Sequence, residues 1–357
     1  MTHALIIGKF YPPHVGHHAM VRFAATVADR VTVVVMSSAV ESISLHDRVA
    51  WMTESHADDA TVTITGIVCD APIDHNSRAV WAAQVACMRA AVRPVTDVLV
   101  DAVVSSEPYG EELARWFDAR HVPFDLQRSA FPVSGTRCRT DLAGSWDLID
   151  APARAGLTTR IVVLGAESTG TTTVSRALAE HFRTRWPRTE WVPEFGRQDT
   201  LDKAERTGSV DDIVWTGDDF ARIAKTQTAM EDAAARRGSP VLICDTDAFA
   251  TTVWERRYLG GESHCAVAED QSAIYLVTDH EGVPFVQDGI RDGEHVRAEM
   301  TGWFIDALTR SGRSWVLLTG SHEERMNLAI RVAEQEVGRR MTFADPLTQI
   351  TADPTAT

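Results

Sequence analysis

The sequence reads Gly8-Lys9-Phe10-Tyr11-Pro12-Pro13-His14-Val15-Gly16-His17 directly after a short apolar run, and Gly165-Ala166-Glu167-Ser168-Thr169-Gly170-Thr171-Thr172 directly after a second one. Glycine-rich turns between a strand and a helix expose backbone N–H groups that bind phosphate. The sequence therefore predicts two nucleotide sites on two α/β domains, and hence an enzyme that catalyses two steps.

Apolar runs rich in β-branched residues alternate with helical periodicity along the chain. In the first half these runs are Ala4 to Ile7, Val31 to Met36, Val62 to Val68 and Val98 to Val104. In the second half they are Ile161 to Leu164, Trp191 to Pro193, Val241 to Cys244, Ala273 to Val277 and Trp315 to Leu318. The alternation predicts an α/β fold with two doubly wound parallel-sheet domains.

The periodic pattern weakens around residues 151–157, where small residues, Pro and Gly gather. We interpret this stretch as a connector, which gives a first domain at 1–150, a linker at 151–159 and a second domain at 160–343. Residues 344–357 contain few large apolar side chains. We expect a disordered tail there.

The charge and composition limit the class of protein. A formal net charge of -15 argues against a general nucleic-acid binder, because such proteins neutralise phosphates with basic surface. Small phosphorylated ligands need only a few local donors and stay possible. No apolar run reaches the roughly 18 residues of a membrane helix, and Met1 leads into a strand-like run without a signal peptide.

The cysteines are scattered and form no CxxC pair, so neither a zinc cluster nor a disulfide framework is indicated. They are Cys69, Cys87, Cys138, Cys244 and Cys265. Together with the missing signal peptide, this pattern predicts a cytoplasmic protein that binds neither membranes nor nucleic acid. Whether it forms a homo-oligomer stays open.

The first site is predicted from two motifs in the first half. His14 and His17 flank a valine and a glycine between a strand and an amphipathic helix, where the helix N-terminus favours phosphate. Gly16 lets a phosphate approach the backbone, and imidazole can donate to an oxyanion. The alternative is a pair of surface histidines at a helix start. The second motif is Ser134-Gly135-Thr136, with Arg139 adding a forked cation suited to phosphate oxygens.

On these residues, the first half resembles the HxGH nucleotidyltransferase superfamily, and residues 8–17 are especially similar to the nicotinamide mononucleotide (NMN) adenylyltransferase part of the bifunctional NadR-type proteins. The resemblance implies a Rossmann-like domain in which the NMN phosphate attacks the α-phosphate of ATP directly, without a covalent enzyme intermediate. Such chemistry needs positioning and charge stabilisation.

The same resemblance implies individual roles. His14 and His17 would stabilise the ATP phosphates beside Lys9, while Ser134 and Arg139 would hold the β and γ groups, with Mg²⁺ neutralising the remainder. Further nucleotide contacts are expected from the small or flanking residues of the two motifs. These are Gly8, Phe10, Gly16, Gly135 and Thr136.

Three further residues are candidates for substrate binding. Glu107 lies in a Ser-Glu segment that resembles the family's segment near adenine. Trp81 is placed to stack on nicotinamide, although an apolar helix favours a core position for it. Arg48 matches an arginine of the family, or it is a solvated residue at a helix start.

The second glycine-rich stretch has the outline of a phosphate-binding loop and leads into a helical run, Val174 to Phe182. Position 171 departs from the pattern, because threonine stands where lysine usually reaches the β and γ phosphates. An ordinary strand–turn–helix connection is the alternative. The expected nucleotide contacts are those of the loop and its first helical residues: Gly165, Glu167, Ser168, Thr169, Gly170, Thr171, Thr172 and Thr173.

The rest of the second half resembles the ribosylnicotinamide kinase domain of the same NadR-type proteins. The matching segments, in the family's order, are Glu194-Phe195-Gly196-Arg197, Asp245-Thr246-Asp247 and Asp288-Gly289-Ile290-Arg291. The resemblance implies a P-loop kinase that phosphorylates the 5′-hydroxyl of nicotinamide riboside with ATP and Mg²⁺.

Chemistry suggests the roles within these segments. Thr172 and Asp245 would ligate Mg²⁺, Asp247 would bind the ribose hydroxyls, and Glu194 would act as general base. Arg197 would lie near the phosphates, unless it and Glu194 form an ordinary surface pair. Arg291, on a lid, would replace the missing lysine.

Two other functions stay open. One is a fused phosphopantetheine adenylyltransferase and dephospho-coenzyme A kinase, which also joins HxGH and P-loop domains. The other is an adenylyltransferase whose degenerate kinase domain acts as a nucleotide sensor, motivated by Thr171. Some NadR-type proteins carry an N-terminal helix-turn-helix that represses transcription, and we expect none here because the first strand begins at about residue 4.

Overall fold

The computed structural model of the chain describes residues 1–261, 263 and 274–348. The chain forms two compact units. The first contains Met1–Gly156 and the described residues from Met341 onward, and the second contains Leu157–Arg340. Of the residues named above, Cys265, Ala273 and 349–357 lie outside the described ranges.

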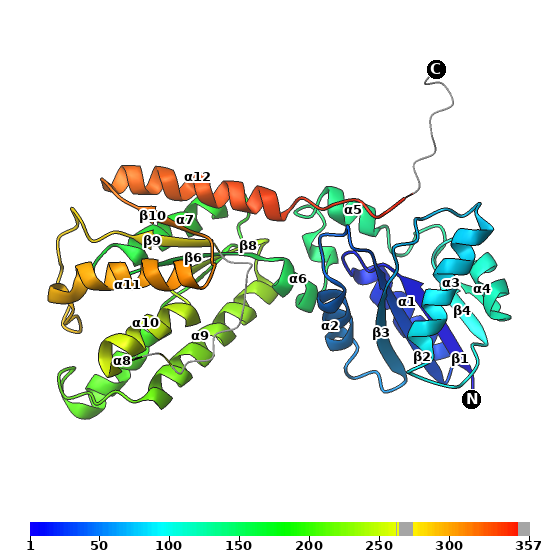
Figure 1. Cartoon of the computed structure of the whole chain (residues 1–357), viewed down its shortest axis with the longest axis horizontal. Helices are drawn as coiled ribbons and strands as arrows, with labels where there is room; N and C mark the ends of the chain where they lie inside the picture. The colour runs from blue at the N-terminus through cyan, green and yellow to red at the C-terminus, as the bar shows by residue number, and fades with distance from the viewer. Residues whose placement is uncertain (262, 264–273, 349–357) are drawn as a thin grey trace, which may run out of the picture. The chain divides into compact units, whose positions relative to one another are not determined.

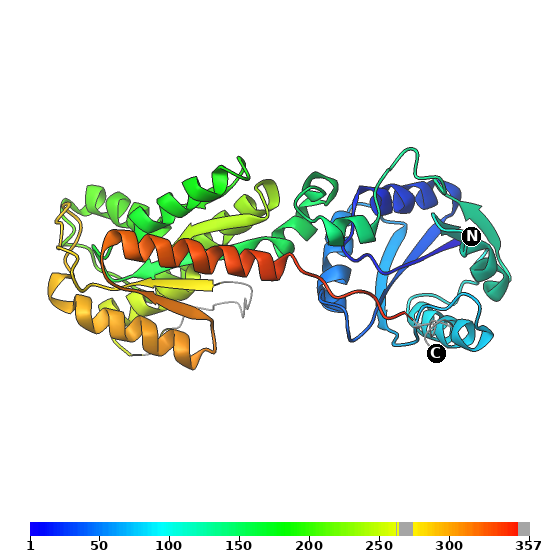
Figure 2. The same cartoon turned by 90° about the horizontal axis from the view of Figure 1, so that it is seen from above.

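The first unit is built on five parallel strands in the order β3-β2-β1-β4-β5. The strands are β1 (His3–Gly8), β2 (Arg30–Ser37), β3 (Val62–Val68), β4 (Ala102–Ser105) and β5 (Arg120–Pro123). The helices are α1 (Val15–Val27), α2 (Leu45–Ser55), α3 (Arg78–Val92), α4 (Gly110–Phe117) and α5 (Gly135–Thr140), and α6 (Ala151–Leu157) follows them. Figures 1 and 2 show the helices arranged around this sheet.

Strand β1 explains why helices cover both faces of the sheet. Successive side chains of a strand point to opposite faces, and every side chain of β1 up to Ile7 is buried. Ala4 and Ile6 pack in one apolar cluster with residues of α1 and α2. Leu5 and Ile7 pack in the other with residues of α3 and α4. The doubly wound arrangement predicted from the apolar runs is therefore confirmed in this unit.

The second unit has its own five-stranded parallel sheet, in the order β10-β9-β6-β8-β7. The strands are β6 (Thr159–Gly165), β7 (Glu190–Val192), β8 (Val241–Asp245), β9 (Ile274–Thr278) and β10 (Trp315–Leu318). The helices are α7 (Thr171–Arg183), α8 (Phe195–Thr207), α9 (Gly217–Arg237), α10 (Ala248–Leu259), α11 (Arg297–Arg310) and α12 (His322–Arg340). Helices α7 and α12 cover one face of the sheet, and α9, α10 and α11 lie on the other (Figure 1).

The structure differs from the sequence prediction at one strand of the first unit. The run from Val98 becomes a strand only at Ala102, because Leu99 faces solvent with 84% of its surface exposed. Strand β5 was not predicted, since its four residues are half-exposed and end in Pro123.

The expected linker at 151–159 is a helix and the start of a strand instead. Helix α6 tolerates Pro152 because its first turn needs no N–H from that residue. The described residues of the expected tail are also ordered against the first unit, where Ala344 is hydrogen-bonded to Tyr11 and Ser42. The composition of this segment, with few large apolar residues, did not predict this contact, because it is made by hydrogen bonds.

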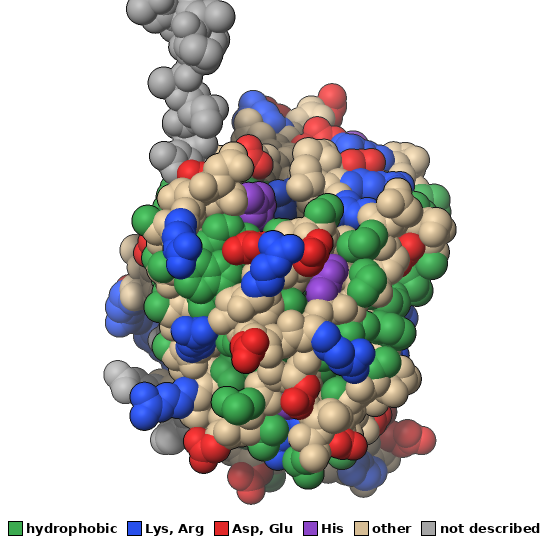
Figure 3. Space-filling model, turned by 90° about the vertical axis from the view of Figure 1, so that its right-hand side faces the viewer, with side chains coloured by type: hydrophobic (Ala, Val, Ile, Leu, Met, Phe, Trp, Pro, Cys, Tyr) green, Lys and Arg blue, Asp and Glu red, His purple; other side chains and the backbone are tan. Residues whose placement is uncertain are grey.

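The surface of the first unit carries charges of both signs. On the face seen in Figure 3, lysine and arginine side chains are interspersed with aspartate and glutamate. Among the described residues, no helix is both long enough and apolar enough to cross a bilayer.

Candidate active sites

The first site lies where the strand order of the first sheet reverses. Strand β1 is paired with β2 on one side and with β4 on the other, and ligands of open α/β sheets bind at the carboxyl ends of strands at such a point. One cavity opens there and brings together most of the predicted residues. They are Gly8, Lys9, Phe10, His17, Trp81, Glu107, Ser134, Gly135, Thr136 and Arg139.

The two histidines lie at the start of α1, as predicted. His14 is the N-cap residue, and its ring stacks on the His17 ring with centroids 3.6 Å apart. His14 is buried and His17 is half-buried, and within the described part of the chain neither His14 nitrogen nor Nδ1 of His17 has a hydrogen-bond partner. Buried polar atoms are costly when unpaired. A ligand rich in oxygen atoms at this helix N-terminus would satisfy them.

Burial also decides the charge of this pair. Desolvation by burial lowers the pKa of His14 to about 3, and the nearby His18 and Arg128 act in the same direction. Desolvation and the neighbouring His14 lower the pKa of His17 well below its usual value. Both rings are therefore neutral at pH 7 without a ligand, and each can donate one hydrogen bond to an anion.

Gly16 also has a steric reason to be glycine. A Cβ atom on this residue would lie 3.3 Å from the His14 ring and 3.4 Å from Phe131. Glycine therefore leaves room for the His14 imidazole at the helix start. Neither Gly16 nor His14 lines the cavity itself.

Helix α5 brings the second motif against the first. Ser134 caps the helix by accepting from the Arg137 N–H at 3.1 Å, so its own hydroxyl hydrogen stays available to a ligand. Arg139 Nη1 donates to the Tyr11 carbonyl at 2.8 Å. A Cβ atom on Gly135 would lie 3.0 Å from that same carbonyl, which explains why glycine is found there.

Arg128 is a cation of this cavity that the sequence did not predict. Its loop is folded around Asp125, which accepts from the N–H groups of Ser129, Ala130 and Phe131. Arg128 Nη2 donates to Glu107 Oε1 at 2.5 Å, and both side chains line the cavity. No local motif marks this arginine, because only the fold brings its loop beside the histidines.

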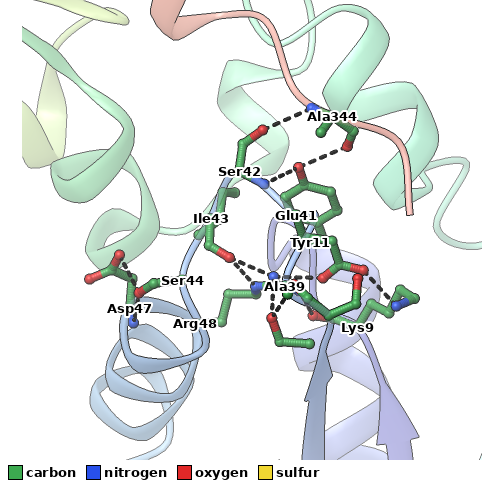
Figure 4. Close-up of polar contacts among 12 residues, drawn as sticks. Lys9, Tyr11, Ala39, Glu41, Ser42, Ile43, Ser44, Asp47, Arg48 and Ala344 are labelled. Atoms are coloured by element: carbon green, nitrogen blue, oxygen red, sulfur yellow. Dashed lines mark hydrogen bonds and ion pairs between the residues drawn. The ribbon is translucent and has the colours of Figure 1, made fainter. Parts of the chain in front are cut away.

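Arg48 does not fit the substrate-binding role that was expected. It is completely buried and donates to the carbonyls of Ile43 and Lys9. It also forms an ion pair with Glu41 at 2.7 Å (Figure 4). Arg48 therefore holds the loop that follows β1 in place and does not line the cavity.

Glu41 pairs with Lys9 as well as with Arg48. Burial alone would raise the pKa of Glu41, but the Lys9 Nζ atom, 2.5 Å from its Oε1, and the Arg48 guanidinium hold it below its usual value. Lys9 lines the cavity, although its ammonium group points to Glu41 in this structure.

Trp81 combines the two roles considered for it. Its ring packs in the apolar cluster of α3 and α4, and it also lines the cavity. The indole Nε1 donates to the His75 carbonyl at 3.1 Å, while the His75 ring stacks on Tyr109 at a centroid distance of 5.5 Å. These rings form an aromatic wall suited to a flat heterocycle.

The second site lies at the end of β6, where the glycine-rich loop leads into α7. Ser168 and Gly170 adopt positive φ angles of 58° and 92°. A Cβ atom on Gly165 would lie 2.3 Å from the Thr278 hydroxyl, so glycine allows β6 and β9 to approach each other closely at the loop. This geometry is that of a phosphate-binding loop.

One cavity joins this loop to the predicted catalytic residues. The predicted residues that line it are Gly165, Glu167, Ser168, Thr171, Thr172, Glu194, Arg197, Asp245 and Arg291. Three predicted loop residues, Thr169, Gly170 and Thr173, do not line it. Thr169 instead fixes the loop, because its hydroxyl donates to the Ala166 carbonyl and contacts Thr278 Oγ1 at 2.6 Å.

Two carboxyl groups, those of Glu194 and Asp245, line this cavity. Burial and the neighbouring Asp245 raise the pKa of Glu194 to about 7. Burial raises the pKa of Asp245 to about 6, although Thr172 Oγ1 donates to its Oδ2 at 2.6 Å. Such a pair is suited to a proton acceptor beside a divalent cation.

The donor set fits Mg²⁺ bound together with a nucleotide. In residues 1–261, 263 and 274–348, no cluster of three or more His, Cys, Asp and Glu side chains is arranged to hold a metal. Mg²⁺ commonly takes one or two protein ligands and completes its shell with phosphate oxygens and water. Thr172 and Asp245 can supply these protein ligands.

Ion pairs connect the expected lid, residues 288–291, to the cavity. Asp288 pairs with Arg197 at 2.7 Å and with Arg291 at 3.3 Å. Glu167, expected to contact the nucleotide, accepts from Arg257 Nη1 at 3.0 Å and from the Gly293 N–H at 2.6 Å. Glu167 thus joins the glycine-rich loop to α10 and to the residue two positions after the lid.

Asp247 does not fit the ribose-binding role that was expected. It caps α10 by accepting from the Ala250 N–H at 2.9 Å, and its other oxygen accepts from the Tyr275 hydroxyl at 2.7 Å. It is buried and does not line the cavity. The structure therefore gives Asp247 a structural role at the helix start.

An aromatic wall in the second cavity was also missed by the sequence analysis. Trp215 packs against Phe220 and Tyr258 with ring centroids 5.4 Å away in each case. All three, together with Trp254, line the cavity. They come from two stretches of the chain, 215–220 and 254–258, which only the fold brings together.

Two family models match the chain, one for each unit. A cytidylyltransferase-like model matches residues 5–141, and an AAA domain model matches residues 160–325. The Trifunctional NAD biosynthesis/regulator protein NadR of Escherichia coli (strain K12) is 23% identical over 334 residues, which are 88% of this chain and 78% of that protein. The protein of the same name from Salmonella typhimurium is 23% identical over 308 residues, 80% of this chain and 71% of that protein.

The chain is thus similar to NadR proteins over most of its length. Two solved NadR structures support its fold, one in complex with NR and one with NAD and AMP-PNP, with TM-scores of 0.58 and 0.60. Each is 18% identical and covers 98% of both chains. The predicted fold class, a nucleotidyltransferase-like domain followed by a P-loop domain, is confirmed for this chain.

Proposed function

We propose that this chain makes NAD in two ATP-dependent steps. The second unit phosphorylates nicotinamide riboside to NMN, and the first unit transfers AMP from ATP to NMN, which gives NAD and pyrophosphate. The observation that carries the proposal is a separate nucleotide-sized cavity at a strand–helix junction in each unit. The NadR relatives, whose names include NAD biosynthesis, support it.

In the first unit, a phosphate oxygen of NMN attacks the α-phosphorus of ATP, and the bond to the β-phosphate breaks. His14, His17 and the N-terminus of α1 stabilise the charge that develops on the phosphates. Arg139 and Ser134 hold the leaving pyrophosphate, and Arg128 adds positive charge beside the histidines. The aromatic wall at Trp81 takes the nicotinamide ring.

In the second unit, the 5′-hydroxyl of nicotinamide riboside attacks the γ-phosphorus of ATP, and ADP leaves. Glu194, with its pKa near 7, accepts the hydroxyl proton. Thr172 and Asp245 would hold Mg²⁺, which would neutralise phosphate charge when bound. The aromatic wall at Trp215 and Tyr258 takes the nicotinamide ring of the riboside.

Arg291 is our candidate to replace the cation missing at Thr171. It lines the same cavity, and its present partners are Asp288 and the Val286 carbonyl. When ATP binds, the phosphates compete for the guanidinium. The alternative is a kinase domain that only senses nucleotide, which Thr171 favours and the carboxyl pair of Glu194 and Asp245 disfavours.

The test is product analysis with nicotinamide riboside, ATP and Mg²⁺. We expect NMN to appear first and NAD and pyrophosphate later, with NAD alone formed from added NMN. Dephospho-coenzyme A and phosphopantetheine, as control substrates, should give no product. If NMN is converted but nicotinamide riboside is not, the kinase assignment is wrong and the adenylyltransferase assignment stands.

Single substitutions separate the two sites. His17→Ala should lower adenylyl transfer by about 100-fold or more while leaving phosphorylation unchanged, because one donor to developing charge is removed. Asp245→Ala should have the reverse effect. Loss of both activities in either folded variant would contradict two separate sites.

We also propose a cytoplasmic location for this activity. The four cysteines in the described part of the chain, Cys69, Cys87, Cys138 and Cys244, are all free thiols. Free thiols are usual in a reducing compartment.

A further inference from the structure

The first unit contains a segment from the far end of the chain. We call residues 341–348 the C-terminal strap. It follows α12, the last helix of the second unit, yet it lies against the loop after β2 in the first unit. The Ile73 N–H donates to the Leu347 carbonyl at 3.0 Å, and Ile73 forms a parallel bridge with Thr348.

Tyr11 is the main contact of the strap. Its hydroxyl donates to the Ala344 carbonyl at 2.9 Å and accepts from the Ser42 N–H at 2.8 Å. The Ala344 N–H donates in turn to Ser42 Oγ at 2.8 Å, which closes a small ring of hydrogen bonds (Figure 4). The Phe343 ring meets the Tyr11 ring edge-on, with centroids 6.1 Å apart.

Tyr11 in turn contacts an arginine of the phosphate site. The Tyr11 ring has the Arg139 guanidinium 4.8 Å from its centroid, and the completely buried Arg48 guanidinium lies at 4.6 Å. The Tyr11 carbonyl also accepts from Arg139 Nη1 at 2.8 Å. The position of Arg139 therefore depends on Tyr11 through two contacts, one to its ring and one to its backbone.

The strap also reaches the cavity directly. Pro346 lines the same cavity as His17, Arg139 and Trp81, next to Ile73. The wall of this cavity thus includes a residue more than 300 positions away from the histidine motif. Without the strap, the Tyr11 hydroxyl would lose its acceptor and the cavity would open at Pro346.

We propose that the C-terminal strap is a positioning element of the adenylyltransferase site. It holds Tyr11 so that Arg139 faces the phosphates of the bound nucleotide, and it closes the cavity at Pro346. The inference rests on the proposed adenylyl transfer. The strap residues, which lie outside the two sequence motifs, thus take part in adenylyl transfer. They take no part in the phosphorylation of nicotinamide riboside.

The test uses the full chain with two substitutions in the strap, Phe343→Ala and Ala344→Pro. The first removes the ring contact and the second removes the N–H that bonds to Ser42. We expect kcat/KM for adenylyl transfer to fall by about 10-fold to 100-fold, as misplaced groups at a phosphoryl-transfer site do. Phosphorylation of nicotinamide riboside by the same sample is the internal reference and should not change.

Matched variants identify the route of the effect. Asp345→Asn changes an exposed side chain of the strap and keeps its backbone, so it should leave both activities unchanged. Phe343→Tyr keeps the aromatic ring and should therefore retain the adenylyl-transfer activity that Phe343→Ala loses. Tyr11→Phe keeps the ring that Arg139 contacts and removes the hydroxyl. If the strap acts through Tyr11, a variant that combines Tyr11→Phe with a strap substitution should lose less kcat/KM for adenylyl transfer than the product of the two single fold-decreases.

Hydrogen exchange gives a readout that does not need activity. In Phe343→Ala and in Ala344→Pro, hydrogen exchange should increase at the Ile73 N–H, at residues 9–12 and in α5. It should stay unchanged at the glycine-rich loop of the second unit. An unchanged adenylyl-transfer rate with a released strap would overturn the inference, as would exchange that rises at Ile73 alone. A wild-type chain without adenylyl transfer would overturn the proposed function instead, and the exchange pattern would still decide the positioning role.

Discussion

At the scale of single residues, burial sets the chemistry of the first site. His14 is an ionisable side chain held neutral by desolvation, beside a second imidazole in the same state. A motif in the sequence predicts that the histidines are present and adjacent, because the spacing is local. It does not predict Arg128, because only the fold of the sheet brings the Arg128 loop to the site. It also does not predict that the side chains of Arg48 and Asp247 form hydrogen bonds within the protein.

The pKa of His14 makes acid stability a test of this burial. An unfolded chain protonates His14 near pH 6.5, whereas the folded chain does so only near pH 3. The contribution of His14 to the free energy of unfolding is therefore fully present above pH 6.5 and is lost as the pH falls toward 3. The steepest slope of this loss is about 1.4 kcal/mol per pH unit.

His14→Gln should flatten this loss in the first unit. The measurement is urea unfolding at pH 7, 6 and 5, followed by hydrogen exchange in α1 with α7 of the second unit as the reference. An identical pH slope in the wild-type chain and the variant would show that His14 is not the buried neutral group described above.

At the scale of elements, the glycine-rich loop and α7 form correctly although the loop lacks its lysine. The positive φ of Gly170 and the contact between Gly165 and Thr278 set the loop, and neither depends on residue 171. Strands with strong apolar alternation were predictable for the same local reason. Strand β5, helix α6 and the strap were not, because packing partners distant in the sequence stabilise them.

Thr171→Lys tests what the missing lysine costs. One charge-assisted hydrogen bond contributes about 1.5 to 3 kcal/mol, so an uncompensated loss of the lysine would slow the kinase by roughly 10-fold to 200-fold. Because Arg291 is proposed to replace the lysine, Thr171→Lys should raise the kinase rate by less than this factor. The measurement is the rate of nicotinamide riboside phosphorylation at saturating ATP, and adenylyl transfer by the same sample serves as the control.

Arg291 supplies the companion measurement. If it replaces the lysine, Arg291→Ala should strongly slow the chain that carries Thr171 and should have a much smaller effect in the Thr171→Lys background. Equal losses in the two backgrounds would show that Arg291 does not compensate for the lysine.

At the scale of the whole molecule, each unit has its own sheet and its own cavity. We therefore expect each substrate to protect only its own unit. Saturating NMN should slow hydrogen exchange at residues 8–17 and in α5, and nicotinamide riboside should do so at the loop after β6 and the start of α8. A ligand at 100 times its Kd stabilises its unit by about 2.7 kcal/mol. Protection of both units by one ligand would contradict separate sites.

The boundary of the first unit has a practical meaning for anyone who wishes to study either activity alone. The polypeptide leaves this unit after Gly156 and returns to it at Met341, so the kinase is an insert within a discontinuous domain. Trimming the chain from its C-terminus would damage the adenylyltransferase before it removed any of the kinase. Genetic dissection therefore calls for internal excision of 157–340 rather than for shortening from one end.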